Sequence, residues 1–296
     1  MSTRAIISRL TDAGIIKHPR LLEWYLSITG REGQLRSGDY TFPSPISAFQ
    51  VIDKMKRGEV HYEHVTIPEG YNRFDIAETL AIKTGKTTKE GFLRLMDDNT
   101  LVKDIVPEAK NLEGYLFPDT YNYNVSTTPQ ELVKSMVRRF FEVFSDEWLE
   151  RARSRGLTVH QVVTLASIIE KEARVPEDRP LISSVFNNRL KIGMPLGADP
   201  TFIYAAIIAG DYDGNPNQPR HRRRLSKYNT YIYAGLPPGP IASPGKASLE
   251  AALYPADTNY LYFVVGGADG HHTFSRSAAE HDAAVARYRK LQQQMR

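Results

Sequence analysis

The spacing of hydrophobic positions along the first half of the chain predicts short helices that alternate with short strands. Residues 5–14 are apolar at positions 6, 7, 10 and 13 and end at a glycine, a pattern typical of an amphipathic helix. The same reading predicts a helix at 19–28, a turn and short strand at 37–43, a helix at 45–57, a strand at 60–67, a turn at 68–70 and a helix at 74–83. The order of a strand, a glycine-containing turn and a helix thus recurs, which favours small α/β units in the first half of the chain.

The second half of the chain is predicted to be mainly helical. Residues 111–121 carry aromatics among turn-forming residues, and Pro118 would interrupt a strand, so an ordered loop is expected there. Helices are expected at 128–144, 158–174, 181–192, 201–209, 248–253 and 278–294, a strand at 260–265 and a long loop at 210–240. We therefore expect an α+β fold with one unit at 1–65, a second small unit and connecting loop at 66–127, and a larger domain at 128–296.

Composition removes several classes of protein from consideration. The 296 residues include no cysteine, which excludes a disulfide scaffold, a thiolate zinc site, an iron–sulfur cluster and a cysteine nucleophile. No apolar stretch approaches the roughly 18–20 residues that a membrane helix needs, and the first residues do not form a signal peptide. The formal charge of +4 is a mild basic excess that suits an anionic polymer.

Two glutamates near the end of the 158–174 helix are the first candidates for chemistry. Positions 162, 166, 169 and 173 define one apolar arc of this helix. Glu170 and Glu172 lie on opposite shoulders of the arc, whereas positions 164, 167 and 171 are expected to face outward. A carboxyl at the edge of a buried face is partly desolvated, which raises its pKa and suits a general acid. The alternative is that both are surface glutamates paired with Lys171, Arg174 or Arg179.

Other clusters favour less specific interpretations. The tyrosine- and asparagine-rich stretch at 228–245 offers flat faces and hydrogen-bonding tips that suit sugar rings, or it packs on its own domain. The basic run at 220–224 lacks interleaved aromatics and any nucleic-acid reader motif, so a solvated loop is favoured over nucleic-acid binding. The adjacent His271 and His272 have no third ligand at a metal spacing, and no metal site is expected. No phosphate-binding loop or nucleophile elbow occurs.

Several motifs, taken in order, resemble one known family. They are Leu-Glu-Gly-Tyr-Leu-Phe-Pro-Asp-Thr-Tyr at 112–121, Ala-Ser-Ile-Ile-Glu-Lys-Glu at 166–172, Ser-Val-Phe-Asn-Asn-Arg-Leu at 184–190, Gly-Met-Pro-Leu-Gly-Ala-Asp-Pro-Thr at 193–201, Tyr-Asn-Thr-Tyr at 228–231 and Gly-Leu-Pro-Pro-Gly at 235–239. Together they are similar to the bacterial endolytic murein transglycosylases, the YceG-like family. The resemblance covers nearly the whole chain, and it outweighs the reading of the glutamates as ordinary surface residues.

The resemblance implies a lytic transglycosylase that cleaves the MurNAc–GlcNAc β-1,4 bond of peptidoglycan and leaves 1,6-anhydro-MurNAc ends. One glutamate would first protonate the glycosidic oxygen and then deprotonate the C6 hydroxyl, which attacks C1 in place of water. Related enzymes of the goose-lysozyme type carry their acid as a glutamate followed by a small residue. That register favours Glu172, followed here by Ala173, and leaves Glu170 as the second choice.

The same resemblance implies further site residues and a glycan-contacting N-terminal unit. Residues 1–65 resemble a LysM-like unit whose first strand is missing from the chain. No cofactor or metal is implied. Candidates for substrate binding are Tyr115, Asp119, Asn187, Asp199, Thr201, Tyr228, Asn229 and Thr230.

Location and partners follow from the family in the same way. Its members are normally anchored to the inner membrane by an N-terminal helix and face the periplasm or exterior, so this chain is expected to be the part outside the membrane. The implied partners are peptidoglycan strands, penicillin-binding proteins and other cell-wall synthesis machinery, with no nucleic acid. The activity would set glycan length; the alternative is a non-catalytic peptidoglycan-binding scaffold protein.

Overall fold

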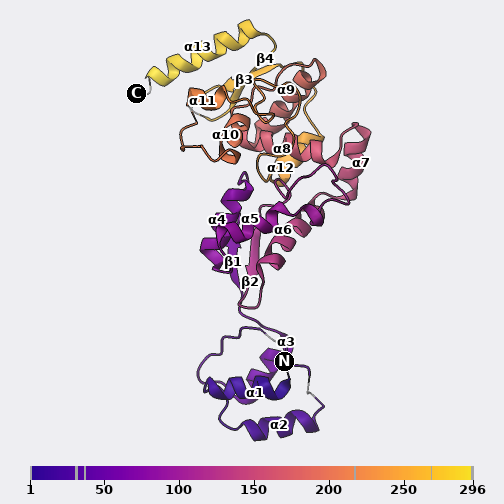
Figure 1. Ribbon diagram of the computed structural model, residues 1–296, viewed down its shortest axis with the longest axis vertical. Coiled ribbons are helices and arrows are strands. Elements are labelled where there is room, and N and C mark those ends of the chain that lie inside the picture. Colours follow the sequence, from indigo (N-terminus) through magenta and orange to yellow (C-terminus); the bar gives the residue numbers. More distant parts are fainter. Residues whose placement is uncertain (1, 31–32, 37, 217, 268, 295–296) are drawn as a thin grey trace. The chain divides into compact units, whose positions relative to one another are not determined.

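The computed structural model describes residues 2–30, 33–36, 38–216, 218–267 and 269–294, and its helices and strands are labelled in Figure 1. The chain divides into two units. The first combines Met1–Val65 with Asn122–Thr128, and the second combines Thr66–Tyr121 with Pro129–Arg296. Of residues 66–127, which were expected to form a second small unit and a connecting loop, 66–121 fall in the second unit and 122–127 in the first.

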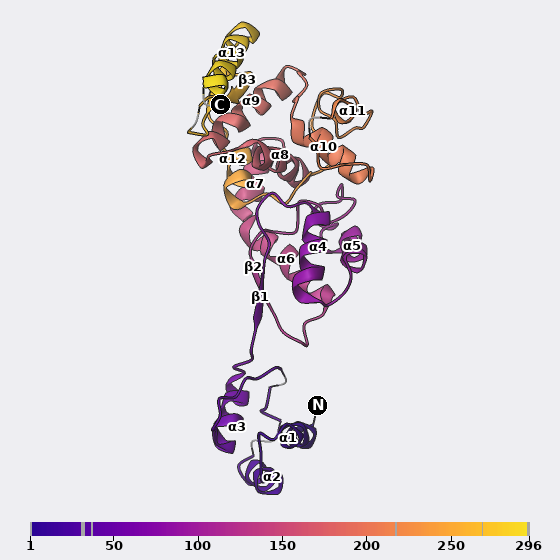
Figure 2. The same ribbon diagram turned by 90° about the vertical axis from the view of Figure 1, so that its left-hand side faces the viewer.

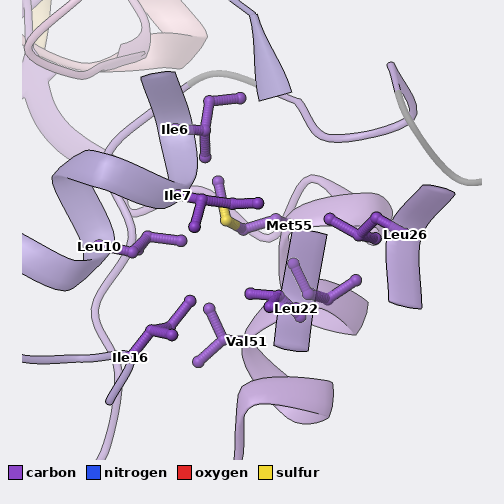
Figure 3. Packing of buried hydrophobic residues seen from close by; sticks show 9 residues of the cluster. Ile6, Ile7, Leu10, Ile16, Leu22, Leu26, Val51 and Met55 are labelled. Carbon is purple, nitrogen blue, oxygen red and sulfur yellow. The ribbon is translucent and has the colours of Figure 1, made fainter. Parts of the chain in front are cut away.

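Three short helices form the first unit: α1 (Thr3–Asp12), α2 (Pro19–Ile28) and α3 (Ala48–Arg57). Their apolar faces share one core, in which Ile7, Leu26 and Val51 are almost fully buried (Figure 3). Helix α3 starts three residues later than expected, because Ser47 and Gln50 form a reciprocal capping box. It ends at Gly58, whose positive φ supplies the left-handed cap.

The strand expected at 37–43 is not formed by residues 38–43; Ser37 lies outside the described residues. Instead, the Tyr40 and Phe42 rings stack with their centroids 5.9 Å apart, and the Tyr40 hydroxyl donates to the Arg36 carbonyl. A strand needs a partner strand to satisfy its backbone groups, and this segment is paired with none. The prediction of a strand here was wrong.

Two strands pair where the chain passes between the units. They are β1 (Glu63–Thr66) and β2 (Thr120–Tyr123), which form a two-stranded sheet. The Thr66 and Thr120 hydroxyls hydrogen-bond at 2.9 Å. Strand β2 begins just after Pro118, so only the part of 111–121 that precedes it is the expected loop.

The second unit contains α8 (Val159–Glu172) and further helices that precede the C-terminal hairpin, which are labelled in Figures 1 and 2. They are α4 (Arg73–Thr84), α5 (Lys89–Asp97), α6 (Pro129–Val143), α7 (Asp146–Ser154), α9 (Arg179–Lys191), α10 (Asp199–Ile208), the short α11 (Pro219–Arg222) and α12 (Lys246–Leu253), with 3-10 turns η1 (Asn99–Leu101) and η2 (Pro176–Asp178). Helices α7, α9, α10 and α12 all contact α8. A helix with so many neighbours is buried on more than one face.

This burial corrects one prediction about α8. Thr164 and Ser167 were expected to face outward, but both are buried. Each hydroxyl donates to a carbonyl of the preceding turn, and the Ser167 Oγ also accepts the Ile241 N–H at 3.1 Å. The loop that follows Pro240 therefore covers the face that the periodicity assigned to solvent.

The C-terminal part adds a hairpin and a long helix. Strands β3 (Tyr262–Val265) and β4 (His272–Ser275) are antiparallel, with Phe263 opposite Phe274. The sequence reading predicted the first strand but not the second. Helix α13 (Ala278–Gln294) has the predicted bounds and packs on this hairpin. Across the described part of the chain, no helix combines the length and hydropathy of a membrane span.

Candidate active site

Both candidate glutamates lie in the last turn of α8. The helix starts at the Thr158 cap, whose side chain forms a reciprocal capping box with Gln161. It ends at Glu172, because Ala173 already has an extended backbone. The C-terminal end of a helix carries partial negative charge, which disfavours ionised carboxylates there. The two glutamates nevertheless have different surroundings.

Both oxygens of the Glu170 carboxylate have partners within the protein. Its side chain is 7% exposed and pairs with Arg179, with the closest nitrogen and oxygen 3.4 Å apart. The other carboxylate oxygen accepts the N–H of Gly245 at 3.0 Å. Arg179 in turn donates to Ser248 on α12. Glu170 therefore ties the end of α8 to the starts of α9 and α12.

Glu172 lies on the other side of the helix end and is partly exposed. The pKa of the Glu172 carboxyl is raised to about 7, mainly by burial of the carboxyl and next by the nearby charge of Asp199. Arg189, Arg174 and the backbone N–H of Asp199 act in the opposite direction and limit the rise. A carboxyl with this pKa holds a proton for part of the time at neutral pH and can both donate and accept one.

A tyrosine and two arginines complete the surroundings of Glu172. The Tyr231 hydroxyl donates to Asp199 Oδ1 at 2.6 Å, and the Arg222 guanidinium lies 4.2 Å from the Tyr231 ring centroid. Arg189 donates to the Leu261 carbonyl at 2.6 Å and also to the Leu196 carbonyl. The site thus combines residues from α8, α9, α10, α11 and the loop after α11.

Three of the predicted substrate-binding residues instead hold two loops together. The Thr201 and Thr230 hydroxyls hydrogen-bond at 2.9 Å, and Thr230 Oγ1 accepts the Ala198 N–H. The Asn229 amide donates to the Arg222 and Arg224 carbonyls. All three of these side chains are buried, so in this structure they shape the loop that presents Tyr231.

Tyr115 and Tyr228 lie in the packing around the Pro238–Gly239 backbone. The Tyr115 side chain is fully buried, and its hydroxyl hydrogen-bonds His160 Nδ1 at 2.7 Å; the other ring nitrogen of this histidine contacts the Pro238 carbonyl. Tyr228 is only partly buried, and its ring centroid lies 5.1 Å from that of Tyr204. Tyr228 therefore retains surface for a ligand, whereas Tyr115 does not.

Asp119 and Asn187 have partners of their own. Asp119 accepts a bond from Arg139 on α6 at 2.8 Å, and Asn187 accepts one from Arg155 at 2.6 Å. No hydrogen bond or ion pair that the structure shows for Asp119 or Asn187 involves Glu172. Among the predicted binding residues, Asp199 is the one whose charge affects the pKa of Glu172.

Sequence reasoning did not nominate Tyr231, Arg174 or Glu69 as site residues. Tyr231 closes the Tyr-Asn-Thr-Tyr motif, so its position in a quoted motif was the available signal. Glu69 lies in the turn before α4, where burial and the charge of Glu170 raise its pKa. Nothing in the local pattern relates Glu69 to α8, because the two are brought together only by the fold.

No group of three or more histidine, aspartate or glutamate side chains in the described ranges is arranged to hold a metal ion. The histidine pair instead contacts one acid: His272 donates its backbone N–H to Asp178 Oδ2 at 2.7 Å, and its ring contacts the same oxygen. His271 contacts the other oxygen. These contacts fasten the hairpin to η2.

Comparisons with known proteins agree with the motifs. The model of the YceG-like family matches residues 1–287. An endolytic murein transglycosylase of Bacillus subtilis (strain 168) is 34% identical over 97% of this chain and 82% of its own length. A Streptococcus pneumoniae (serotype 2, strain D39) protein of the same name is 29% identical over 97% of this chain but only 56% of its own length. A crystal structure of a yceG-like protein from Listeria monocytogenes superimposes with a TM-score of 0.67 at 32% identity, over 96% of this chain and 95% of that one. The chain belongs to the YceG-like family.

Proposed function

We propose that this protein is an endolytic lytic transglycosylase of peptidoglycan and that Glu172 is its catalytic acid and base. The relatives named endolytic murein transglycosylase support the reaction class. The observation that carries the assignment of the acid is the contrast between the two glutamates: the Glu170 carboxylate is bound by Arg179 and Gly245, whereas the pKa of Glu172 is raised to about 7.

The reaction needs one carboxyl in two protonation states. In the first step the Glu172 carboxyl gives its proton to the glycosidic oxygen between MurNAc and GlcNAc; that C–O bond breaks, and C1 gains oxocarbenium character. In the second step the Glu172 carboxylate removes the proton of the C6 hydroxyl, whose oxygen bonds to C1. The product is a 1,6-anhydro-MurNAc end, no water is consumed, and Glu172 regains its proton.

The Tyr-Asn-Thr-Tyr motif also suits a sugar polymer. Tyr228 and Tyr231 are partly exposed and offer ring faces next to hydrogen-bonding groups. We propose that glycan contacts these rings, while buried Thr201, Asn229 and Thr230 fix the loop that carries them. Tyr115, Asp119 and Asn187 then act on binding only through the elements they brace.

Further proposals concern the rest of the chain and its setting. Residues 1–65 are proposed to contact glycan as a LysM-like unit. The protein is proposed to work in the bacterial cell envelope, at the inner membrane, on strands delivered by penicillin-binding proteins or related machinery. In that setting its cleavage would set glycan length.

The test incubates the protein with un-crosslinked glycan strands and measures anhydro-muropeptides by mass spectrometry. Glu172→Gln should lower kcat by at least about a hundredfold, because general acid–base catalysis contributes that much or more. The matched control is Glu250→Gln on the exposed side of α12, which should keep wild-type activity. Activity retained by Glu172→Gln but lost by a folded Glu170→Gln would reverse the assignment.

The second candidate is a peptidoglycan-binding scaffold protein without catalysis. It predicts that wild type binds glycan strands and yields no anhydro products at any pH. The raised pKa of Glu172 argues against it, because a scaffold has no use for a proton-bearing carboxyl at an accessible helix end.

A further inference from the structure

The basic run at 220–224 is anchored to the rest of the second unit. Helix α11, which contains the first part of the run, packs on α10 (Figure 2). The side chain of His221 is fully buried, and its Nε2 contacts Asp213 at 3.3 Å. The Asn229 amide of the Tyr-Asn-Thr-Tyr motif donates to two backbone carbonyls of the run, at 2.9 and 3.0 Å. The run is therefore fixed to that motif.

Acidic partners neutralise only part of the charge of this segment. Arg220 pairs with Asp213 at 2.8 Å, and Arg224 pairs with Asp211. Three exposed cations have no acidic partner among the described residues: Arg222, Arg223 and Lys227. We call these three the cation surface. Its charge is open to an anion from outside the chain.

The cation surface adjoins the two tyrosines that are proposed to contact glycan. Lys227 directly precedes Tyr228 in the chain. The Arg222 guanidinium lies 4.2 Å from the Tyr231 ring centroid, and this cation–π contact fixes its charge beside the ring. The ring is held in turn, because the Tyr231 hydroxyl donates to Asp199 at 2.6 Å. A glycan strand bound to these rings therefore brings its substituents to the cations.

The substituents of a peptidoglycan strand include anions. Each MurNAc bears a short stem peptide on its lactyl ether, and in an un-crosslinked strand this peptide ends in a free carboxylate. The sugar rings themselves are uncharged. A guanidinium binds a carboxylate through paired, charge-assisted hydrogen bonds, and an ammonium attracts it as a point charge. Arginines and a lysine beside sugar-binding rings thus match a polymer that combines sugars with carboxylates.

We propose that the cation surface binds the carboxylates of the stem peptides, so that the enzyme selects strands whose stems are present and charged. This rests on the proposed function, in which Tyr228 and Tyr231 contact glycan. The position of the cations next to these rings favours a peptide-bearing glycan over the phosphates of a lipid surface or a nucleic acid. The basic run thereby gains a role that its sequence, typical of a solvated loop, did not indicate.

The experiment compares two forms of un-crosslinked glycan strands, both with acetylated amino groups. One form keeps its stem carboxylates, and in the other carbodiimide coupling with ammonia has converted them to amides. The selectivity is the ratio of kcat/KM for the charged form to kcat/KM for the amidated form. Wild type should give a ratio of about ten at low salt, because each exposed ion pair adds up to about fivefold. The ratio should fall towards one in about 0.5 M NaCl, which screens such pairs.

Variants of the two cations that do not contact Tyr231 test the assignment. Arg223→Gln combined with Lys227→Gln should lower the ratio to about two, since two of the three cations are removed. Arg223→Lys combined with Lys227→Arg keeps both charges and should keep most of the selectivity. The control is Lys134→Gln combined with Arg138→Gln, because both are exposed cations on α6 and their replacement changes the net charge by the same amount.

A ratio near one for active wild type, or a ratio of about ten after loss of both cations, would overturn the proposal while the proposed function stands. If wild type has no activity, the proposed function fails, and the ratio of the dissociation constants of the two strands, measured by calorimetry, tests the cation surface in its place. Phosphatidylglycerol vesicles are the last probe. Vesicle binding that needs Arg223 and Lys227, without selectivity between the strands, would assign the surface to a membrane and overturn the proposal.

Discussion

At the scale of single residues, burial and partners separate carboxyls that look alike in sequence. Glu113 illustrates a structural carboxyl: it is buried, both its oxygens accept the Arg73 N–H at 3.1 Å, and Tyr204 donates to one of them at 2.8 Å. Burial raises its pKa to about 7 despite these donors. Glu172 reaches a similar pKa at a site that solvent can reach. A raised pKa therefore marks a candidate acid only together with access.

Glu113 should make stability depend on pH. The pKa of Glu113 in the folded state lies above its ordinary value of 4.5, so its contribution to the unfolding free energy is full below about pH 4.5 and is lost as pH rises through about 7. Glu113→Gln cannot ionise. We expect the unfolding free energy of wild type minus that of the variant to fall by about 3 kcal/mol from pH 4.5 to 8. Urea denaturation at several pH values measures this difference; a difference independent of pH would contradict the prediction. The contribution of Glu172 to the unfolding free energy is the same in both proteins and therefore cancels in the difference.

At the scale of elements, the hairpin of β3 and β4 depends on one acid outside it. Asp178 in η2 is buried and accepts bonds from His271 and His272 at the start of β4. Burial alone would raise the pKa of Asp178, but the bonds from His272 and His271 outweigh it and lower that pKa. The hairpin is thus attached by a carboxylate whose own contribution to stability is full at neutral pH and is lost as pH falls through its lowered pKa.

Asp178→Asn should loosen this attachment, because one oxygen and the negative charge are lost. We expect amide hydrogen exchange in β4 to become about tenfold faster at pH 7, equivalent to about 1.4 kcal/mol, while α8 keeps its protection. Hydrogen exchange with mass spectrometry gives the comparison. Glu177→Gln, a change of the exposed neighbour in η2, serves as the control. Equal exchange in wild type and Asp178→Asn would show that the hairpin does not need this acid.

At the scale of the whole molecule, two units carry separate cores. The core of the first unit is made by α1, α2, α3 and Ile16, which lies between α1 and α2, and the core around α8 belongs to the second unit. Long-range contacts are concentrated within each unit, so each is expected to open as its own cooperative region. Catalytic and structural changes in α8 should therefore be separable from changes in the N-terminal unit.

Leu26→Ala tests this separation. Leu26 is fully buried in the first core, and its truncation should cost about 3 kcal/mol there. Hydrogen exchange should become faster in α1, α2 and α3 but remain unchanged in α8 and α9. Differential scanning calorimetry should show the lower-temperature part of the profile move alone. Equal loss of protection in both units would contradict separate opening.

Local sequence determined most of the elements. The bounds of α2 and α13 were predicted to the residue, and the start of α8 was predicted to within one residue, because helical periodicity depends on residues a few positions apart. The ordered motifs also indicated the family, since they are properties of the chain alone. Strand β4 was missed, because a strand is completed by a partner elsewhere in the chain.

Only the tertiary structure decided what lies opposite each side chain. The periodicity of α8 placed Glu170 and Glu172 equally, and the contacts that distinguish them come from Gly245 and Asp199, far along the chain. Likewise the periodicity assigned Ser167 to solvent, but Ile241 covers it in the fold. The hydrogen bond from Tyr231 to Asp199 also exists only because distant segments meet. Periodicity fixes the direction in which a side chain leaves its helix, whereas its pKa and accessibility depend on which distant segments fold against it.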